Sequence, residues 1–141
     1  AEKYKLKHIV RITADCPFSD PKLIDKLVNK YFRGGYNYVS NVNPPSFPNG
    51  FDIEIFKLNT LKKSFKLFKN SINKEHVTFA IRKNMKLKKY NLAIKHNLNH
   101  VRLTLDNKSD LIKIRKLAKH INIADDWKSI YLKNTKINYE N

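Results

Sequence analysis

Two aspartates, Asp15 and Asp106, each close a similar run of residues. Residues 10–15 read VRITAD, and residues 101–106 read VRLTLD. This alternation of apolar and polar residues is typical of a β-strand. Ligands of open α/β sheets bind outside the carboxyl ends of the strands, so we expect both carboxylates at that edge. There they could share a Mg²⁺ ion, which proteins usually bind through one or two carboxylates plus phosphate oxygens.

A second interpretation of the two aspartates is structural. Aspartate often follows a strand because its side chain caps the next helix. Helix-start signals follow both aspartates: Asp20 before Pro21, and Asn107 with Asp110 three residues further on. The pattern alone therefore supports metal binding and helix capping about equally.

Four blocks of sequence occur in a definite order along the chain. They are VRITADCPFSDP at 10–21, YVSN at 38–41, PNGFDIEIF at 48–56 and EHVT at 75–78. Together with LTLD at 103–106, these blocks resemble the SpsF-like branch of the sugar cytidylyltransferases, which serves spore coat polysaccharide synthesis. The superfamily includes the acylneuraminate and Kdo cytidylyltransferases. The resemblance extends over nearly the whole chain, to the region of Trp127.

The resemblance implies a fold and a reaction. The fold is an α/β, Rossmann-like nucleotidyltransferase with a mostly parallel sheet flanked by helices, of which this chain is the sugar-binding, C-terminal half. The reaction is transfer of CMP from CTP to a sugar acid or a related sugar, with release of pyrophosphate, in surface polysaccharide biosynthesis. A Mg²⁺ cofactor, a cytoplasmic location and a homodimer are consistent with that family.

The resemblance also implies the site. Asp15 and Asp106 are the catalytic, metal-binding carboxylates. The substrate side consists of Asn41, Gly50, Asp52, Glu54, Glu75, His76 and Arg82. The sequence departs from the family pattern at Ala14, where glycine is common, and at residues 107–110, where NKSD replaces the usual Thr-Pro-Glu-Asp.

One part of the family pattern is missing. The chain has only three glycines, Gly34, Gly35 and Gly50. The first two follow a helical pattern and predict a helix stop. No strand is followed by a Gly-rich loop and a helix, the arrangement that binds nucleotide phosphates. We therefore expect the nucleotide loop to be absent from these 141 residues, which form a single domain, 1–141.

Periodicity and turn residues predict the elements that position these side chains. Strands are expected at 8–13, 36–40, 51–56, 86–94 and 99–105. The strand at 51–56 places Asp52 and Glu54 on one face, toward solvent or a polar pocket. Helices are expected from Pro21 to Gly34, after a cap at Asn59 or Thr60, from about residue 75 to 82, after Asn107, and briefly after Asp125. The second helix should bury Leu61, Phe65 and Phe68, and the tail beyond Asn134 should be loose.

Composition limits the other functions. The net charge of +17 is typical of nucleic-acid binding, so a basic polyanion-binding module is the alternative function, with a non-catalytic remnant as a third. The charge is spread along the chain and is mostly lysine, which argues against specific nucleic-acid recognition. No apolar run is long enough to cross a bilayer. The lone cysteine, Cys16, cannot form an internal disulfide, and we expect it to be a small buried residue.

Overall fold

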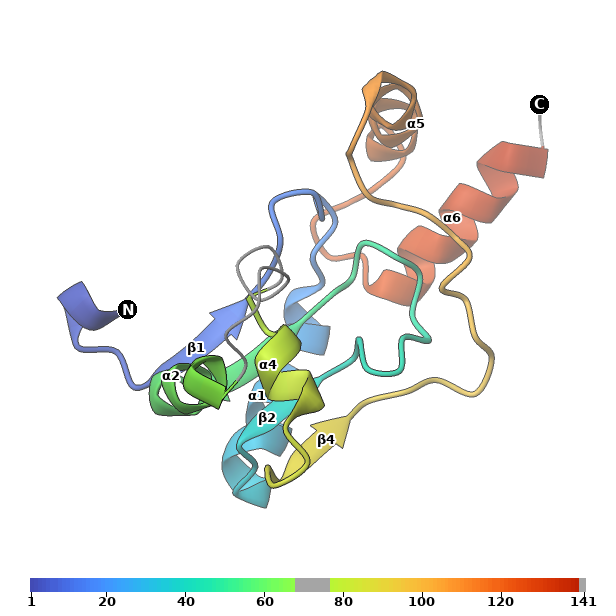
Figure 1. Ribbon diagram of the computed structural model, residues 1–141. Coiled ribbons are helices and arrows are strands. Elements are labelled where there is room, and N and C mark those ends of the chain that lie inside the picture. Colours follow the sequence, from blue (N-terminus) through green and yellow to red (C-terminus); the bar gives the residue numbers. More distant parts are fainter. Residues whose placement is uncertain (68–76, 140–141) are drawn as a thin grey trace.

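A four-stranded sheet forms the centre of the computed structural model, which describes residues 1–67 and 77–139 (Figure 1). The strand order is β1-β3-β2-β4, with bounds β1 (His8–Arg11), β2 (Tyr38–Ser40), β3 (Glu54–Lys57) and β4 (Lys89–Asn91). β3 pairs antiparallel with β1 and β2, whereas β2 and β4 pair in parallel. The predicted α/β architecture is confirmed, with a mixed sheet in which three of the four strands share one direction.

Helices cover both faces of the sheet (Figure 1). A short 3₁₀-helix (Glu2–Tyr4) precedes β1. On one face α1 (Pro21–Gly34) packs its buried residues Leu23, Leu27 and Tyr31 against Val39 and Ile55 of the sheet and against Ile53, which directly precedes β3. On the other face lie α2 (Leu58–Leu67) and α4 (Phe79–Lys83), where Ile81 packs with Tyr38 and Phe56. Alternate residues of each central strand thus enter opposite cores.

The predicted signals at the ends of α1 are confirmed. The Asp20 carboxylate accepts the backbone N–H groups of Lys22 at 2.8 Å and Leu23 at 3.1 Å, which satisfies two donors that a helix start leaves free. Gly35, with φ of 60°, ends the helix in the left-handed conformation. The second Asp20 oxygen accepts the N–H of Trp127 at 2.9 Å, so this cap also anchors the C-terminal part of the chain.

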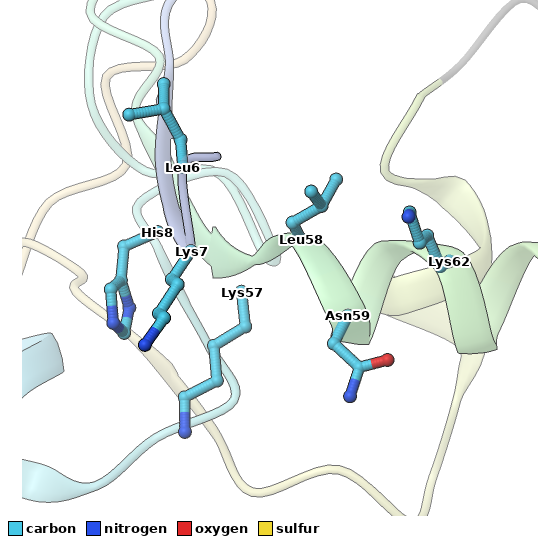
Figure 2. A pocket seen from close by; sticks show the side chains of 7 residues that line it. All are labelled: Leu6, Lys7, His8, Lys57, Leu58, Asn59 and Lys62. Carbon is cyan, nitrogen blue, oxygen red and sulfur yellow. The ribbon is translucent and has the colours of Figure 1, made fainter. Parts of the chain in front are cut away.

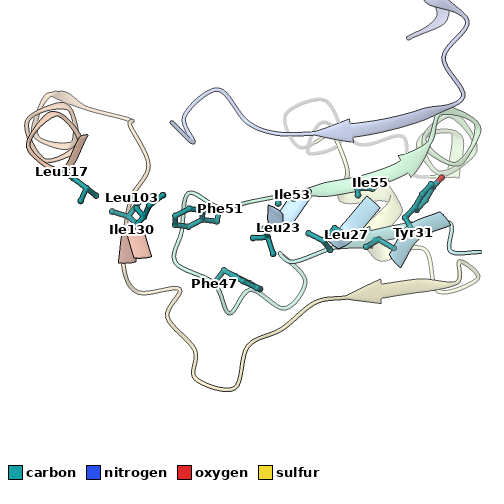
Figure 3. Packing of buried hydrophobic residues seen from close by; sticks show 11 residues of the cluster. Leu23, Leu27, Tyr31, Phe47, Phe51, Ile53, Ile55, Leu103, Leu117 and Ile130 are labelled. Atoms are coloured by element: carbon teal, nitrogen blue, oxygen red, sulfur yellow. The ribbon is translucent and has the colours of Figure 1, made fainter. Parts of the chain in front are cut away.

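Two helices follow the last strand, α5 (Lys108–Ala118) and α6 (Trp127–Tyr139). α5 begins with the predicted capping box, in which Asn107 and Asp110 exchange side-chain and backbone hydrogen bonds. The larger core continues to these helices, where Leu103, Leu117 and Ile130 meet Phe51 (Figure 3). The expected loose tail is wrong as far as Tyr139, because α6 continues to that residue.

Three other predictions about elements are wrong. α2 begins directly after β3, so Asn59 and Thr60 lie inside the helix rather than at its cap. Among the α2 residues whose burial is described, Thr60 and Ser64 are buried and the predicted Leu61 is partly buried against the core, whereas Phe65 is 44 % exposed. Phe68 lies outside the described residues. Residues 99–105 form no strand of the sheet, and their ladder contact is a single parallel bridge between Asn49 and Arg102.

Candidate active site

One edge of the sheet collects most of the predicted site residues. Arg11 and Ser40, at the carboxyl ends of β1 and β2, both pair with Glu54 at the start of β3. Asp15 and Asn41 follow β1 and β2 along the chain, and Gly50 and Asp52 precede β3. Carboxyl ends of parallel strands are where ligands of open α/β sheets bind. The expected edge is therefore the one that these residues share.

The segment that carries Asp106 lies beside this edge. Asn49 and the segment exchange backbone hydrogen bonds, from the Asn49 N–H to Val101 O at 2.9 Å and from the Leu103 N–H to Asn49 O at 2.8 Å. Further on, the Leu105 N–H donates to Asp15 O at 2.9 Å. Asp106, the next residue, is thereby held beside the backbone of Asp15. The two similar runs thus meet at their ends instead of lying as strands in one sheet.

Gly50 lets the segment approach so closely. Its φ of +119° is a conformation that other residues rarely adopt. A Cβ atom at this position would lie 2.8 Å from the backbone oxygen of Leu103. Gly50 therefore lets the loop before β3 pack against the segment that carries Asp106, which differs from the direct substrate contact that the resemblance implies.

The Asn41 side chain links two backbone positions inside the protein. The side chain is buried, its Nδ2 donates to Phe51 O at 2.7 Å, and its Oδ1 accepts the Ile53 N–H at 2.8 Å. Both ends of the amide are engaged with the backbone on either side of Asp52. In this structure Asn41 fixes the loop that presents Asp52.

Glu54 is the centre of a buried ion cluster. Only 2 % exposed, it accepts hydrogen bonds from Arg11 Nη1 at 2.6 Å and from the Tyr38 hydroxyl at 2.5 Å. Arg82 Nε lies 3.9 Å from Glu54 Oε1 and has no hydrogen-bond partner among the described residues. Burial, followed by the charge of Glu54, raises the pKa of Tyr38. Solvent and a polar pocket were the two expected surroundings, and the structure places Glu54 among buried polar groups rather than in solvent.

Asp52 and Asp15 form a second acidic group next to this cluster. Asp52 is partly buried, and burial raises the pKa of its carboxyl, with further contributions from the charges of Glu54 and Asp15. Cys16 is buried as expected, and burial also raises the pKa of its thiol. A thiol that stays protonated is a poor nucleophile, so these observations favour the carboxylates as the chemical groups of the edge.

Sequence reasoning missed the residue that binds Asp106. Arg102 Nη2 donates to Asp106 Oδ2 at 2.6 Å and to Asp110 Oδ2 at 2.9 Å, and the Thr104 hydroxyl donates to Asp106 Oδ2 at 2.9 Å. A signal was present, because Arg102 and Arg11 occupy the same position in the two similar runs. Each of them forms an ion pair with a carboxylate of the site.

The chemistry of the donors at this edge fits Mg²⁺. Asp106 Oδ1 accepts no hydrogen bond from any described residue, and the Asp15 carboxylate has only a 3.9 Å contact with Cys16 Sγ. Carboxylate oxygens are the ligands that Mg²⁺ prefers. Within the described ranges, no three His, Cys, Asp or Glu side chains gather to hold a metal ion. An ion here would therefore need water or phosphate oxygens as further ligands. Glu75 and His76 lie outside the described residues.

A basic cavity of about 480 Å³ lies at the other end of β1 and β3. Lys7, His8 and Lys57 extend to the same side of the ribbon (Figure 2). Lys62, also in the lining, forms an ion pair with Glu2. This cavity is separate from the acidic edge and gathers several of the chain's basic side chains.

Comparisons with known proteins agree with the fold. A family model described as Cytidylyltransferase matches residues 1–139. A solved structure of a cytidylyltransferase from Leptospira borgpetersenii serovar Hardjo-bovis superposes with a TM-score of 0.88 at 25 % identity, over 98 % of this chain and 60 % of that one. An uncharacterized protein of Methanocaldococcus jannaschii is 38 % identical over 76 residues, which are 54 % of this chain and 30 % of that protein.

The chain matches only part of each of these relatives. It spans less than two thirds of the length of either matched protein. Among the described residues, no helix combines the length and the apolar character that a membrane span requires. The family model extends over nearly all of the chain, and the superposition covers the same region. The chain belongs to the cytidylyltransferase family.

Proposed function

We propose that this chain is part of an enzyme that transfers CMP from CTP to a hydroxyl of a sugar acid or related sugar, in surface polysaccharide biosynthesis. Membership of the cytidylyltransferase family supports nucleotidyl transfer. The observation that carries the site is the hydrogen bond between Leu105 and Asp15, which brings the two aspartate-bearing segments together. Because the chain spans only part of its relatives, the activity is proposed for the whole protein.

In this proposal Asp15 and Asp106 hold Mg²⁺. When bound, the ion neutralises charge on the phosphates. The sugar hydroxyl attacks the α-phosphorus of CTP and releases its proton to solvent, the bond from that phosphorus to the bridging oxygen breaks, and pyrophosphate leaves. No covalent intermediate on the protein is required, so this chain mainly holds the reacting groups in place.

The remaining predicted residues divide into two roles. Asn41, Gly50 and Glu54 are held by contacts inside the protein, and we assign them to shaping the edge. Asp52 is the described carboxylate that we assign to the sugar, because it is only partly buried and lies near Asp15. Arg82, Glu75 and His76 stay in the proposal as sugar- or phosphate-side residues. A cytoplasmic location and a homodimer belong to the same proposal.

The test is a pyrophosphate-release assay on the polypeptide encoded by the complete gene. It uses CTP, UTP and ATP separately, with Mg²⁺ and a panel of sugar acids and neutral sugars. We expect release with CTP and at least one sugar acid. The 141-residue chain alone should give only background, because it lacks a Gly-rich phosphate loop. Equal rates with the three nucleotides, or no release with any sugar, would contradict the proposal.

A further inference from the structure

The guanidinium group of Arg102 lies among the carboxylates of the candidate site. Its Nη2 bonds both Asp106 and Asp110. Its pKa is raised, chiefly by the hydrogen bond to Asp110, and also by the charges of Asp110, Asp106 and Asp15. Arg102 is therefore within electrostatic reach of both proposed metal carboxylates, although it was not among the expected site residues.

The contacts on Asp106 are one-sided. Arg102 and Thr104 both donate to Oδ2, whereas no described residue donates to Oδ1. A carboxylate that is bonded on one oxygen cannot rotate freely, so its other oxygen keeps a fixed direction. This asymmetry leaves Oδ1 available to a ligand.

Arg102 is itself firmly placed. Its partner Asp110 is 7 % exposed, and Asp110 Oδ2 also accepts the N–H groups of Asp106 at 3.0 Å and Asn107 at 3.2 Å. The backbone of Arg102 is held by its β-bridge to Asn49. Arg102 thus connects the start of α5 with the loop before β3, and both ends of this connection are fixed.

We propose that Arg102 is a positioning residue: by holding Oδ2 of Asp106, it presents Oδ1 to a divalent cation shared with Asp15. This inference rests on the proposed function. The positive charge of Arg102 also repels a cation, but the side chain is 48 % exposed, and water and salt screen exposed charges. Groups that orient a metal ligand are typically worth about 10- to 100-fold in metal affinity, so orientation should outweigh repulsion.

The test uses Mn²⁺ as a paramagnetic probe and NMR of the ¹⁵N-labelled 141-residue chain. Mn²⁺ should broaden the amide signals of Asp15 and Asp106 in a saturable way. We expect Arg102→Ala to weaken the apparent Mn²⁺ affinity about 10-fold and Arg102→Lys to restore part of it. Arg115→Ala removes the same charge from the exposed face of α5 and should leave the affinity unchanged.

Two further variants separate the possible failures. If Asp106→Asn abolishes the broadening and Arg102→Ala binds Mn²⁺ as tightly as the unaltered chain or more tightly, the role of Arg102 is wrong and the metal site stands. If Asp15→Asn and Asp106→Asn both leave the broadening unchanged, the metal site of the proposed function fails. The dispersion of the NMR spectrum shows whether each variant is folded. If Arg102→Ala does not fold, the Mn²⁺ affinity of Arg102→Lys is compared with that of the unaltered chain instead.

Discussion

The backbone N–H of Leu105 donates a 2.9 Å hydrogen bond to the carbonyl oxygen of Asp15. This bond joins the ends of two similar runs that lie far apart in sequence. Asn49 and Gly50 bring the second run to the sheet edge through a backbone bridge and a close contact with Leu103. The site therefore depends on how one extended segment packs beside the sheet.

Replacing Gly50 with alanine should destabilise the protein and loosen this packing. The new Cβ would meet the Leu103 backbone oxygen, and the φ of +119° is unfavourable for alanine. We expect a loss of roughly 2 kcal/mol or more in the free energy of unfolding, measured by urea denaturation. Gly35→Ala is the matched control, because its φ is +60° but nothing lies within 4 Å of the added Cβ. If Gly35→Ala costs as much as Gly50→Ala, the close contact is unimportant.

The ion cluster at Glu54 predicts an unequal pair of substitutions. Arg11→Met leaves a carboxylate that is 2 % exposed without its closest cation, whereas Glu54→Gln leaves arginines that are about 30 % exposed and can reach water. Since a stranded buried charge is the costlier defect, Arg11→Met should lose about 2–3 kcal/mol and Glu54→Gln about 1–2 kcal/mol. Chemical denaturation measures both. Lys62→Met, which breaks the surface pair with Glu2, should change little; the opposite order of the first two losses would refute the prediction.

Asp52 predicts a pH dependence of stability. Because burial raises the pKa of its carboxyl in the folded protein, folding favours the protonated form. The resulting stabilisation is present below the ordinary aspartate pKa and is lost as the pH rises through the raised value. Asp52→Asn removes this dependence, so its melting temperature should exceed that of the unaltered protein at pH 7 and approach it near pH 3. A difference that stays constant between these pH values would show that Asp52 does not titrate in this way.

Polyanion binding should be weak, sensitive to salt and indifferent to sequence. The net charge of +17 is spread over the chain, and such charges are screened beyond about 8 Å at physiological ionic strength. Binding to single-stranded DNA, measured by fluorescence anisotropy, should collapse as salt rises. Lys7→Glu with Lys57→Glu in the basic cavity should weaken it about as much as Lys108→Glu with Lys113→Glu on α5. Tight, sequence-selective binding at physiological salt would instead favour the polyanion-binding function.

Local signals in the sequence predicted the parts of the fold that depend on neighbouring residues. The Asp20 cap, the glycine stop of α1 and the Asn107 capping box each involve residues a few positions apart. The burial of Thr60 and Ser64 on α2 was not predictable in this way. Ser64 is buried there and lies 3.4 Å from Asn84 Nδ2, so small polar residues allow close packing where the apolar pattern favoured Phe65.

In the candidate site as well, local sequence patterns predicted some features, whereas others depend on how distant segments pack. The strand pattern placed Asp15 correctly after β1, but alternation at 99–105 could not reveal that this segment has Asn49 as its single ladder partner. The roles of Arg11 and Arg102 depend on which carboxylates the fold brings near them. Arg11 reaches Glu54 through the β1–β3 register, whereas Arg102 reaches Asp106 within its own segment. Only the contact between Arg102 and Asp106 could be predicted from residue spacing in the sequence.

The assignment of Asp15 and Asp106 as metal carboxylates is tested by the CTP-dependent release of pyrophosphate by the complete gene product carrying Asp15→Asn or Asp106→Asn. Loss of a metal carboxylate should remove a few kcal/mol of transition-state stabilisation, which lowers turnover on the order of 100-fold or more. Melting temperatures should change little, because both side chains lie outside the buried core. Asp25→Asn, on the exposed side of α1, is the control and should keep full turnover. Normal turnover by either site variant, or unfolding of both, would contradict the assignment of these two carboxylates.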